Sequence, residues 1–143
     1  MSYRLFIDSS VLFAAAYSTR GHAHDLILMG VRGQVTLVMS RLVLEETRRN
    51  LAASAPESLP ALERLLDNLS LEIVRPSKDE VVAAAQYTAL KDAPILAAAR
   101  IAKVDLLVTL DRKHLLRKPD LETYARAAIR TPVEAYRKIT EAA

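Results

Sequence analysis

The feature that most constrains the fold is an alternation between short apolar runs typical of β-strands and longer stretches typical of α-helices. Four apolar runs predict strands, at residues 3–7, 35–39, 71–74 and 105–109. Helical stretches separate each run from the next, and this alternation is typical of a mostly parallel sheet with helical crossovers. In the last run Leu106, Leu107 and Val108 follow one another directly, which predicts a strand buried on both faces.

Capping signals mark where several of the helices are expected to begin. Three Ser or Thr residues precede a Glu by three positions, the spacing of a capping box: Ser54 with Glu57, Ser77 with Glu80, and Thr131 with Glu134. They predict helices that run to about residues 68, 90 and 140. Ser40 and Asp92 are expected to cap two further helices, over 41–53 and 93–103. Residues 122–129 fit either a final strand or a helix.

Composition limits the class of protein. The chain has 143 residues, which predicts one domain over residues 1–143, and 51% of them are hydrophobic, which excludes intrinsic disorder. It has no Cys, which excludes disulfides and thiolate zinc sites. No apolar run approaches the ~20 residues of a membrane span, so a soluble cytoplasmic protein is expected. The net charge of +3 permits an anionic partner without requiring one.

Two acids lie just beyond predicted strands. Asp8 follows Leu5-Phe6-Ile7, and Asp111 follows the run that ends at Leu110. The carboxyl ends of parallel strands lie at one edge of a sheet, where open α/β sheets bind ligands. The structural alternative for Asp8 is a cap for the helix that follows.

Two more acids lie on expected helices. Asp92 opens one helix, where a carboxylate can cap with one oxygen and bind a cation with the other. Glu46 shares a helical face with Leu42 and Val43 and is therefore expected to point inward. Its neighbour Glu45 shares a face with three arginines, Arg41, Arg48 and Arg49, and is expected to lie in an ion-paired, solvent-exposed stripe. An inward Glu needs a basic side chain, a donor or a metal as its partner.

Together the four acids suggest a carboxylate cluster with too few basic neighbours to neutralise it. Oxygen-only ligand sets suit Mg²⁺ or Mn²⁺. One or two such ions can bind a phosphodiester, activate a water and stabilise the leaving oxygen.

The sequence resembles the PIN domain family, which includes the VapC-type toxins of toxin–antitoxin pairs. The matching segments are residues 6–12 (FIDSSVL), 40–51 (SRLVLEETRRNL), 92–99 (DAPILAAA), 107–111 (LVTLD) and 131–136 (TPVEAY). The resemblance implies a three-layer α/β fold, with a central mostly parallel sheet of four or five strands flanked by helices. It also implies that four acids hold Mg²⁺ or Mn²⁺: Asp8, Glu46, Asp92 and Asp111. Ser10 and Thr109 match hydroxyl positions of the family, where they would orient a carboxylate or a water.

One motif departs from the family. Many relatives carry another acid just before the position of Asp92, whereas this chain has Leu90-Lys91. The four acids remain intact, but the local charge changes.

The function expected from this resemblance is a metal-dependent endoribonuclease that hydrolyses RNA phosphodiester bonds, and a toxin partnered by an antitoxin protein. A homodimer is a further expectation, because relatives often form dimers, although the Ala-rich helices suit core packing equally well. One alternative is a catalytically silent PIN-like module that binds RNA or protein. Another is a phosphotransfer enzyme with a similar acidic sheet edge, against which the chain lacks an obvious phosphate-clamping Lys after the Asp8 motif.

The remaining polar residues give weaker signals. Basic residues gather after Asp111 and form either a phosphate-binding rim or a solvated turn: Arg112, Lys113, Arg117 and Lys118. The three histidines, His22, His24 and His114, are interpreted as surface side chains rather than as ligands or bases.

Overall fold

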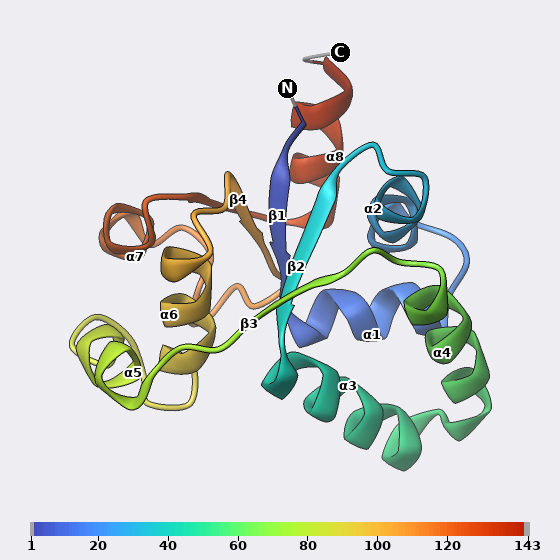
Figure 1. Ribbon diagram of the computed structural model, residues 1–143, viewed down its shortest axis with the longest axis horizontal. Helices are drawn as coiled ribbons and strands as arrows, with labels where there is room; N and C mark the ends of the chain where they lie inside the picture. The colour runs from blue at the N-terminus through green and yellow to red at the C-terminus, as the bar shows by residue number, and fades with distance from the viewer. Residues whose placement is uncertain (1, 142–143) are drawn as a thin grey trace.

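The computed structural model describes residues 2–141 and contains a five-stranded parallel sheet (Figure 1). The strands are β1 (Arg4–Ile7), β2 (Thr36–Ser40), β3 (Glu72–Val74), β4 (Leu106–Val108) and β5 (Ala128–Arg130). They lie in the order β3-β2-β1-β4-β5, and all four pairings are parallel. The predicted α/β fold with a mostly parallel sheet of four or five strands is confirmed.

Helices cover both faces of the sheet and give three layers (Figure 1). On one side lie α1 (Ser9–Tyr17), α2 (His22–Val31), α3 (Arg41–Ser54), α4 (Leu59–Asp67) and α8 (Pro132–Glu141). On the other side lie α5 (Lys78–Ala84), α6 (Ala93–Ile101) and α7 (Pro119–Ala125). This division follows from right-handed crossovers, because the chain moves in one direction from β1 to β3 and in the other from β3 to β5.

The core lies around the three inner strands, β2, β1 and β4. Leu5, Phe6 and Ile7 of β1 and all three residues of β4 are fully buried, as the predicted two-sided burial requires. On α6, residues 95–99 are also buried, so this Ala-rich stretch packs in the core. It is therefore not available as the flat dimer interface that its composition also allowed.

The helix caps show which helix ends the local sequence determines and which it does not. Hydrogen bonds in both directions join Ser77 to Glu80 and Thr131 to Glu134, so these two predicted capping boxes are confirmed. The box predicted at Ser54 is wrong, because α3 continues through Ser54 and a 3₁₀ turn over Pro56–Ser58 precedes α4. The helix that starts after Ser77 ends at Ala84, short of the predicted residue 90.

The ambiguous segment at 122–129 contains both a helix and a strand. Arg126 ends α7 in the left-handed region, at φ 55° and ψ 38°, which turns the chain into β5. No residue type that favours this conformation stands there, so the sequence did not indicate the break.

The strand order places a ligand-binding position between β1 and β4. From β1 the chain proceeds to β2 on one side, and from β4 it proceeds to β5 on the other. At such a switch the loops diverge and leave a crevice at the carboxyl ends of the strands. Among residues 2–141, no helix has both the length and the apolar character needed to cross a membrane.

Candidate active site

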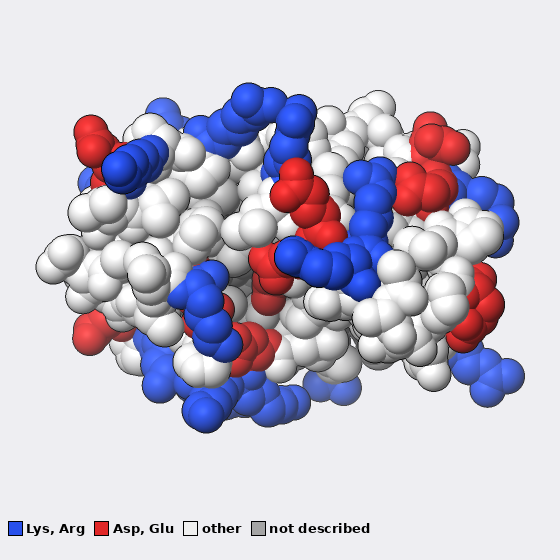
Figure 2. Space-filling view, turned by 90° about the horizontal axis from the view of Figure 1, so that it is seen from below, with Lys and Arg blue, Asp and Glu red and all other residues white. Residues whose placement is uncertain are grey.

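All four predicted acids line one cleft at the carboxyl edge of the sheet, although they come from four segments. Asp8 follows β1, Asp111 lies just beyond β4, Asp92 precedes α6 and Glu46 lies on α3. The cleft has a volume of about 350 Å³ and is also lined by Ser9, Ser10, Lys91, Ile95 and Leu110. Figure 2 views the molecule from this edge and shows acidic side chains near the middle of the face, with Lys and Arg around them.

Asp8 is held by three hydrogen bonds at the end of β1. Its Oδ1 accepts from the backbone N–H of Ser9 at 2.8 Å, so the predicted capping role is real. Its Oδ2 accepts from the Thr109 hydroxyl at 2.7 Å and from the Ser10 hydroxyl at 3.2 Å. Burial raises the pKa of Asp8, the three hydrogen bonds oppose this rise, and nearby Asp111 adds to it.

Ser10 and Thr109 connect the two loops at the switch. The Ser10 hydroxyl accepts from the backbone N–H of Leu110 at 3.1 Å, and the Thr109 hydroxyl accepts from that of Asp111 at 3.0 Å. Each hydroxyl therefore donates to Asp8 while it fixes the backbone near Asp111. Both hydroxyls thus hydrogen-bond the Asp8 carboxylate, and their part in a metal site stays a prediction.

Asp92 presents a buried carboxylate oxygen without a partner. The residue is only 9% exposed, and its Oδ2 is buried with no hydrogen bond to any of residues 2–141. The predicted cap is wrong, because the Asp92 backbone is already helical (φ −97°, ψ −13°), whereas a capping side chain needs extended backbone. Burial raises the pKa of Asp92; Lys91 opposes the rise and Asp111 adds to it. A buried carboxylate oxygen without a donor is expensive and fits a cation.

Glu46 and Glu45 lie as the helical spacing predicts, with Glu46 half-buried and Glu45 exposed. Burial raises the pKa of Glu46, and the charges of Asp8 and Asp92 raise it further, while Arg49 lowers it. Glu46 therefore belongs electrostatically to the cleft. The ion pairing expected for Glu45 is wrong, because among residues 2–141 Glu45 forms no ion pair and Arg48 instead pairs with Glu63 of α4 at 2.9 Å.

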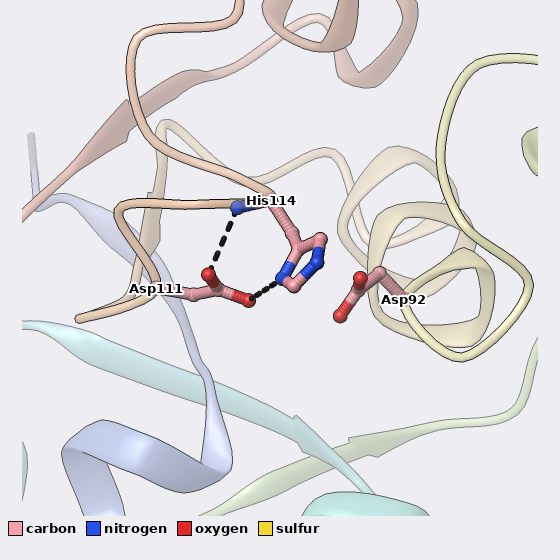
Figure 3. Close-up of side chains that lie close together, drawn as sticks. All are labelled: Asp92, Asp111 and His114. Atoms are coloured by element: carbon pink, nitrogen blue, oxygen red, sulfur yellow. Dashed lines mark hydrogen bonds and ion pairs between the residues drawn. The ribbon is translucent and has the colours of Figure 1, made fainter.

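Asp111 organises the turn that follows β4 and brings a histidine to the site. Its Oδ1 accepts from the backbone N–H groups of Lys113 and His114, at 3.1 and 2.9 Å. The Nδ1 of His114 lies 3.3 Å from its Oδ2. One ligand atom each from Asp92, Asp111 and His114 lie within 4.8 Å of one another (Figure 3). His114 is therefore the site-adjacent residue that the sequence interpretation missed.

The other histidines lie elsewhere. The His22 ring packs against Tyr136 with 4.7 Å between ring centroids, and His24 Nδ1 lies 2.8 Å from the carbonyl oxygen of Ala15. Neither belongs to a group of possible metal ligands among residues 2–141.

Basic side chains surround the cleft without neutralising it. Lys91 lines the cleft, and Arg112 and Arg117 line a neighbouring groove that shares Leu110 with it. Within the described part of the chain, no Lys or Arg forms an ion pair with any of the four acids. The result is a negative centre inside a positive surround, which suits a divalent cation together with a phosphate-bearing ligand.

The fold and the site define an α/β protein with a carboxylate cluster at its topological switch. Residues 4–113 match the family model described as PIN domain, which is more than half of the 143 residues. The chain therefore belongs to the PIN domain family. No protein with a curated description matches it.

Several solved structures share the fold over most of the chain. PAE2754 from Pyrobaculum aerophilum is 21% identical and superposes with a TM-score of 0.68, over 99% of this chain and 98% of that chain. VapBC2 from Rickettsia felis, bound to a DNA fragment from the promoter, is 14% identical with a TM-score of 0.63, over 90% and 98%. VapC20 from Mycobacterium tuberculosis, a sarcin–ricin loop cleaving toxin, is 15% identical with a TM-score of 0.54, over 72% and 86%. At these identities the likeness concerns the fold.

Proposed function

We propose that this protein is a Mg²⁺- or Mn²⁺-dependent endoribonuclease and the toxin of a toxin–antitoxin pair. One observation carries the enzymatic part: four carboxylates meet in one cleft, and the buried Asp92 Oδ2 among them has no hydrogen-bond donor. Membership of the PIN domain family supports a nuclease.

The donor set fits a hard divalent cation. Asp8, Asp92 and Asp111 would hold the ion, and their like charges favour its entry because they otherwise repel one another. When bound, such an ion supplies Lewis-acid stabilisation of a phosphodiester and lowers the pKa of a coordinated water.

The protein's own side chains prepare this reaction. Thr109 and Ser10 fix the Asp8 carboxylate, so that little reorganisation is needed when substrate enters. Glu46, whose pKa is raised, either completes the ligand set or orients the attacking water as a proton acceptor. Lys91 in the cleft and Arg112 beside it provide positive charge for the RNA backbone.

A cleavage assay with the matched pair Glu46→Gln and Glu45→Gln tests this proposal. Single-stranded RNA and ribosomal RNA are incubated with the protein in Mn²⁺ or in EDTA. We expect cleavage in Mn²⁺ alone, a loss of about 10²-fold in Glu46→Gln and no change in Glu45→Gln. Cleavage that survives EDTA, or that is lost more in Glu45→Gln, would contradict the proposal. Metal binding without cleavage of any RNA would favour the silent binding module.

The toxin assignment draws on the structural neighbour VapC20, described as a sarcin–ricin loop cleaving toxin, and on the likeness to VapBC2. It predicts that induced expression in a bacterial host arrests growth and that Asp92→Asn, expressed equally, does not. Equal growth of the two strains would remove the toxin role and leave the nuclease proposal standing.

A further inference from the structure

The turn after β4 places the imidazole of His114 beside the acidic cleft. The function proposed above gives this possible metal ligand no role. His114 lies three residues after Asp111, and the backbone N–H groups of Lys113 and His114 both donate to Asp111 Oδ1. This short turn folds the His114 side chain back against the carboxylate that anchors it. Its side chain is 28% exposed, so it stands at the edge of the cleft rather than in free solvent.

The His114 imidazole is oriented so that one of its nitrogens can bind a metal ion. His114 Nδ1 lies 3.3 Å from Asp111 Oδ2, so the ring has one nitrogen committed to a carboxylate. Figure 3 shows the imidazole between the carboxylates of Asp111 and Asp92, with its other nitrogen on the side toward Asp92 in this view. Histidines that bind metals usually donate their second N–H to a carboxylate in this way, which fixes the tautomer.

The carboxylate of Asp92, which faces the ring, has one oxygen without a hydrogen-bond partner among residues 2–141. Asp92 is nine-tenths buried, its Oδ2 has no partner, and one of its oxygens belongs to the group of ligand atoms within 4.8 Å that includes His114. Asp92 therefore indicates a cation independently of the clustering of acids. His114 also lines a second hollow, together with Lys113 and Arg117.

We propose that His114, oriented by Asp111 through Nδ1, is a ligand through its other ring nitrogen of the cation held by Asp92, and that it biases the site toward Mn²⁺ over Mg²⁺. Mg²⁺ is a hard cation that prefers oxygen ligands and near-ideal octahedral geometry. First-row transition ions also accept imidazole nitrogen. A mixed oxygen and nitrogen set therefore favours Mn²⁺ relative to a site made of oxygens alone.

Mn²⁺ itself is the probe, because its electron spin senses a directly bonded ¹⁴N nucleus. The full chain is loaded with MnCl₂ and studied by electron spin-echo envelope modulation, and Mn²⁺ and Mg²⁺ affinities are measured by calorimetry. His114→Gln is compared with wild type, and His22→Gln serves as the matched control because His22 packs against Tyr136 away from the cleft.

We expect a ¹⁴N modulation in wild type and in His22→Gln that is absent in His114→Gln. We also expect the Mn²⁺ dissociation constant of His114→Gln to rise about tenfold and that for Mg²⁺ to rise less than about threefold. A wild-type spectrum without ¹⁴N modulation, or a modulation that persists in His114→Gln, would overturn the assignment. An equal loss of Mn²⁺ and Mg²⁺ affinity would overturn it too, since His114 would then only position Asp111.

Because the inference rests on the proposed function, the same samples are assayed for RNA cleavage. Wild-type protein that binds neither cation and cuts no RNA would remove both proposals together. Protein that binds Mn²⁺ without nitrogen ligation and still cuts RNA would remove the role of His114 alone.

Discussion

The two ends of the parallel sheet treat acidic residues in opposite ways. At the amino end, Arg4 of β1 forms a bidentate ion pair with Glu72 of β3, at 2.8 and 2.9 Å, and Asp105 Oδ2 accepts from the Arg4 backbone N–H at 2.7 Å. The hydrogen bond and charge of Arg4 lower the pKa of Glu72. Acids at this end are therefore matched with donors inside the fold.

At the carboxyl end, burial and mutual repulsion raise the pKa of Asp8, Glu46 and Asp92. No Lys or Arg pairs with them among residues 2–141. The fold gives Glu72 an Arg partner at one end and, among residues 2–141, gives the four acids at the other end no Lys or Arg partner, which is the charge pattern that a divalent cation fits.

The largest effect should come from removing charge at the unpaired end. Asp92→Asn should lower metal-dependent RNA cleavage by at least about 10²-fold, because a ligand should cost no less than the supporting groups around it. Glu72→Gln, which removes charge at the paired end, should leave cleavage unchanged. Initial rates in Mn²⁺ at equal protein concentration measure both. Comparable losses in the two variants would break the contrast between the ends.

The outline of this site was predictable from sequence because it depends on local patterns. Asp8 and Asp111 follow apolar runs that form buried strands, and Glu46 shares a helical face with apolar neighbours. Strand ends and helix faces are set by nearest neighbours, and parallel topology then brings the strand ends together.

The parts that the sequence did not predict depend on backbone conformation at single residues. Asp92 has the residue type of a cap, but its backbone is helical and its side chain is free of that role. His114 reaches the site only because Asp111 folds the following turn against itself. Ser54 matched a capping box, yet α3 continued through it. At Asp92 and Ser54 the residue type favoured a cap that the backbone did not adopt, and at His114 a local turn decided where the side chain lies.

The second largest effect on RNA cleavage should come from removing the Thr109 hydroxyl, which hydrogen-bonds Asp8. Thr109→Val keeps the shape of a fully buried side chain but leaves Asp8 Oδ2 and the Asp111 N–H each without one hydrogen bond. Cleavage should fall about tenfold, the lower end expected for a group that orients ligands. Thr123→Val is the matched control, since the Thr123 hydroxyl donates to the Pro119 carbonyl on α7, away from the cleft. Unchanged cleavage in Thr109→Val would show that Asp8 needs no such support.

A smaller effect should appear in the pH dependence of the free energy of unfolding when no metal is bound. The raised pKa values mean that the native state binds protons more tightly than the unfolded chain, so stability should fall as pH rises from about 4 through the raised values. Asp92→Asn should remove part of this fall, a gain on the order of 1 kcal/mol at neutral pH. Urea unfolding across pH in EDTA measures it. Saturating Mn²⁺ should stabilise wild type more than the variant, and a fall of equal size in both proteins would contradict this origin.

The smallest effect should come from the paired end, and it should concern stability alone. Glu72→Gln removes the charge opposite Arg4, but both side chains are partly exposed, at 47% and 33%, so water screens the pair. Such pairs contribute less than about 1 kcal/mol to the free energy of unfolding. The free energy of unfolding lost in Glu72→Gln should be smaller in high salt. It should not change on adding Mn²⁺, because the proposed metal site lies at the other end of the sheet. Urea unfolding at two salt concentrations, with and without Mn²⁺, measures both dependences. If Mn²⁺ changed the stability lost in Glu72→Gln, the two ends of the sheet would be coupled. That result would contradict the view that the amino end stabilises the fold and the carboxyl end binds the cation.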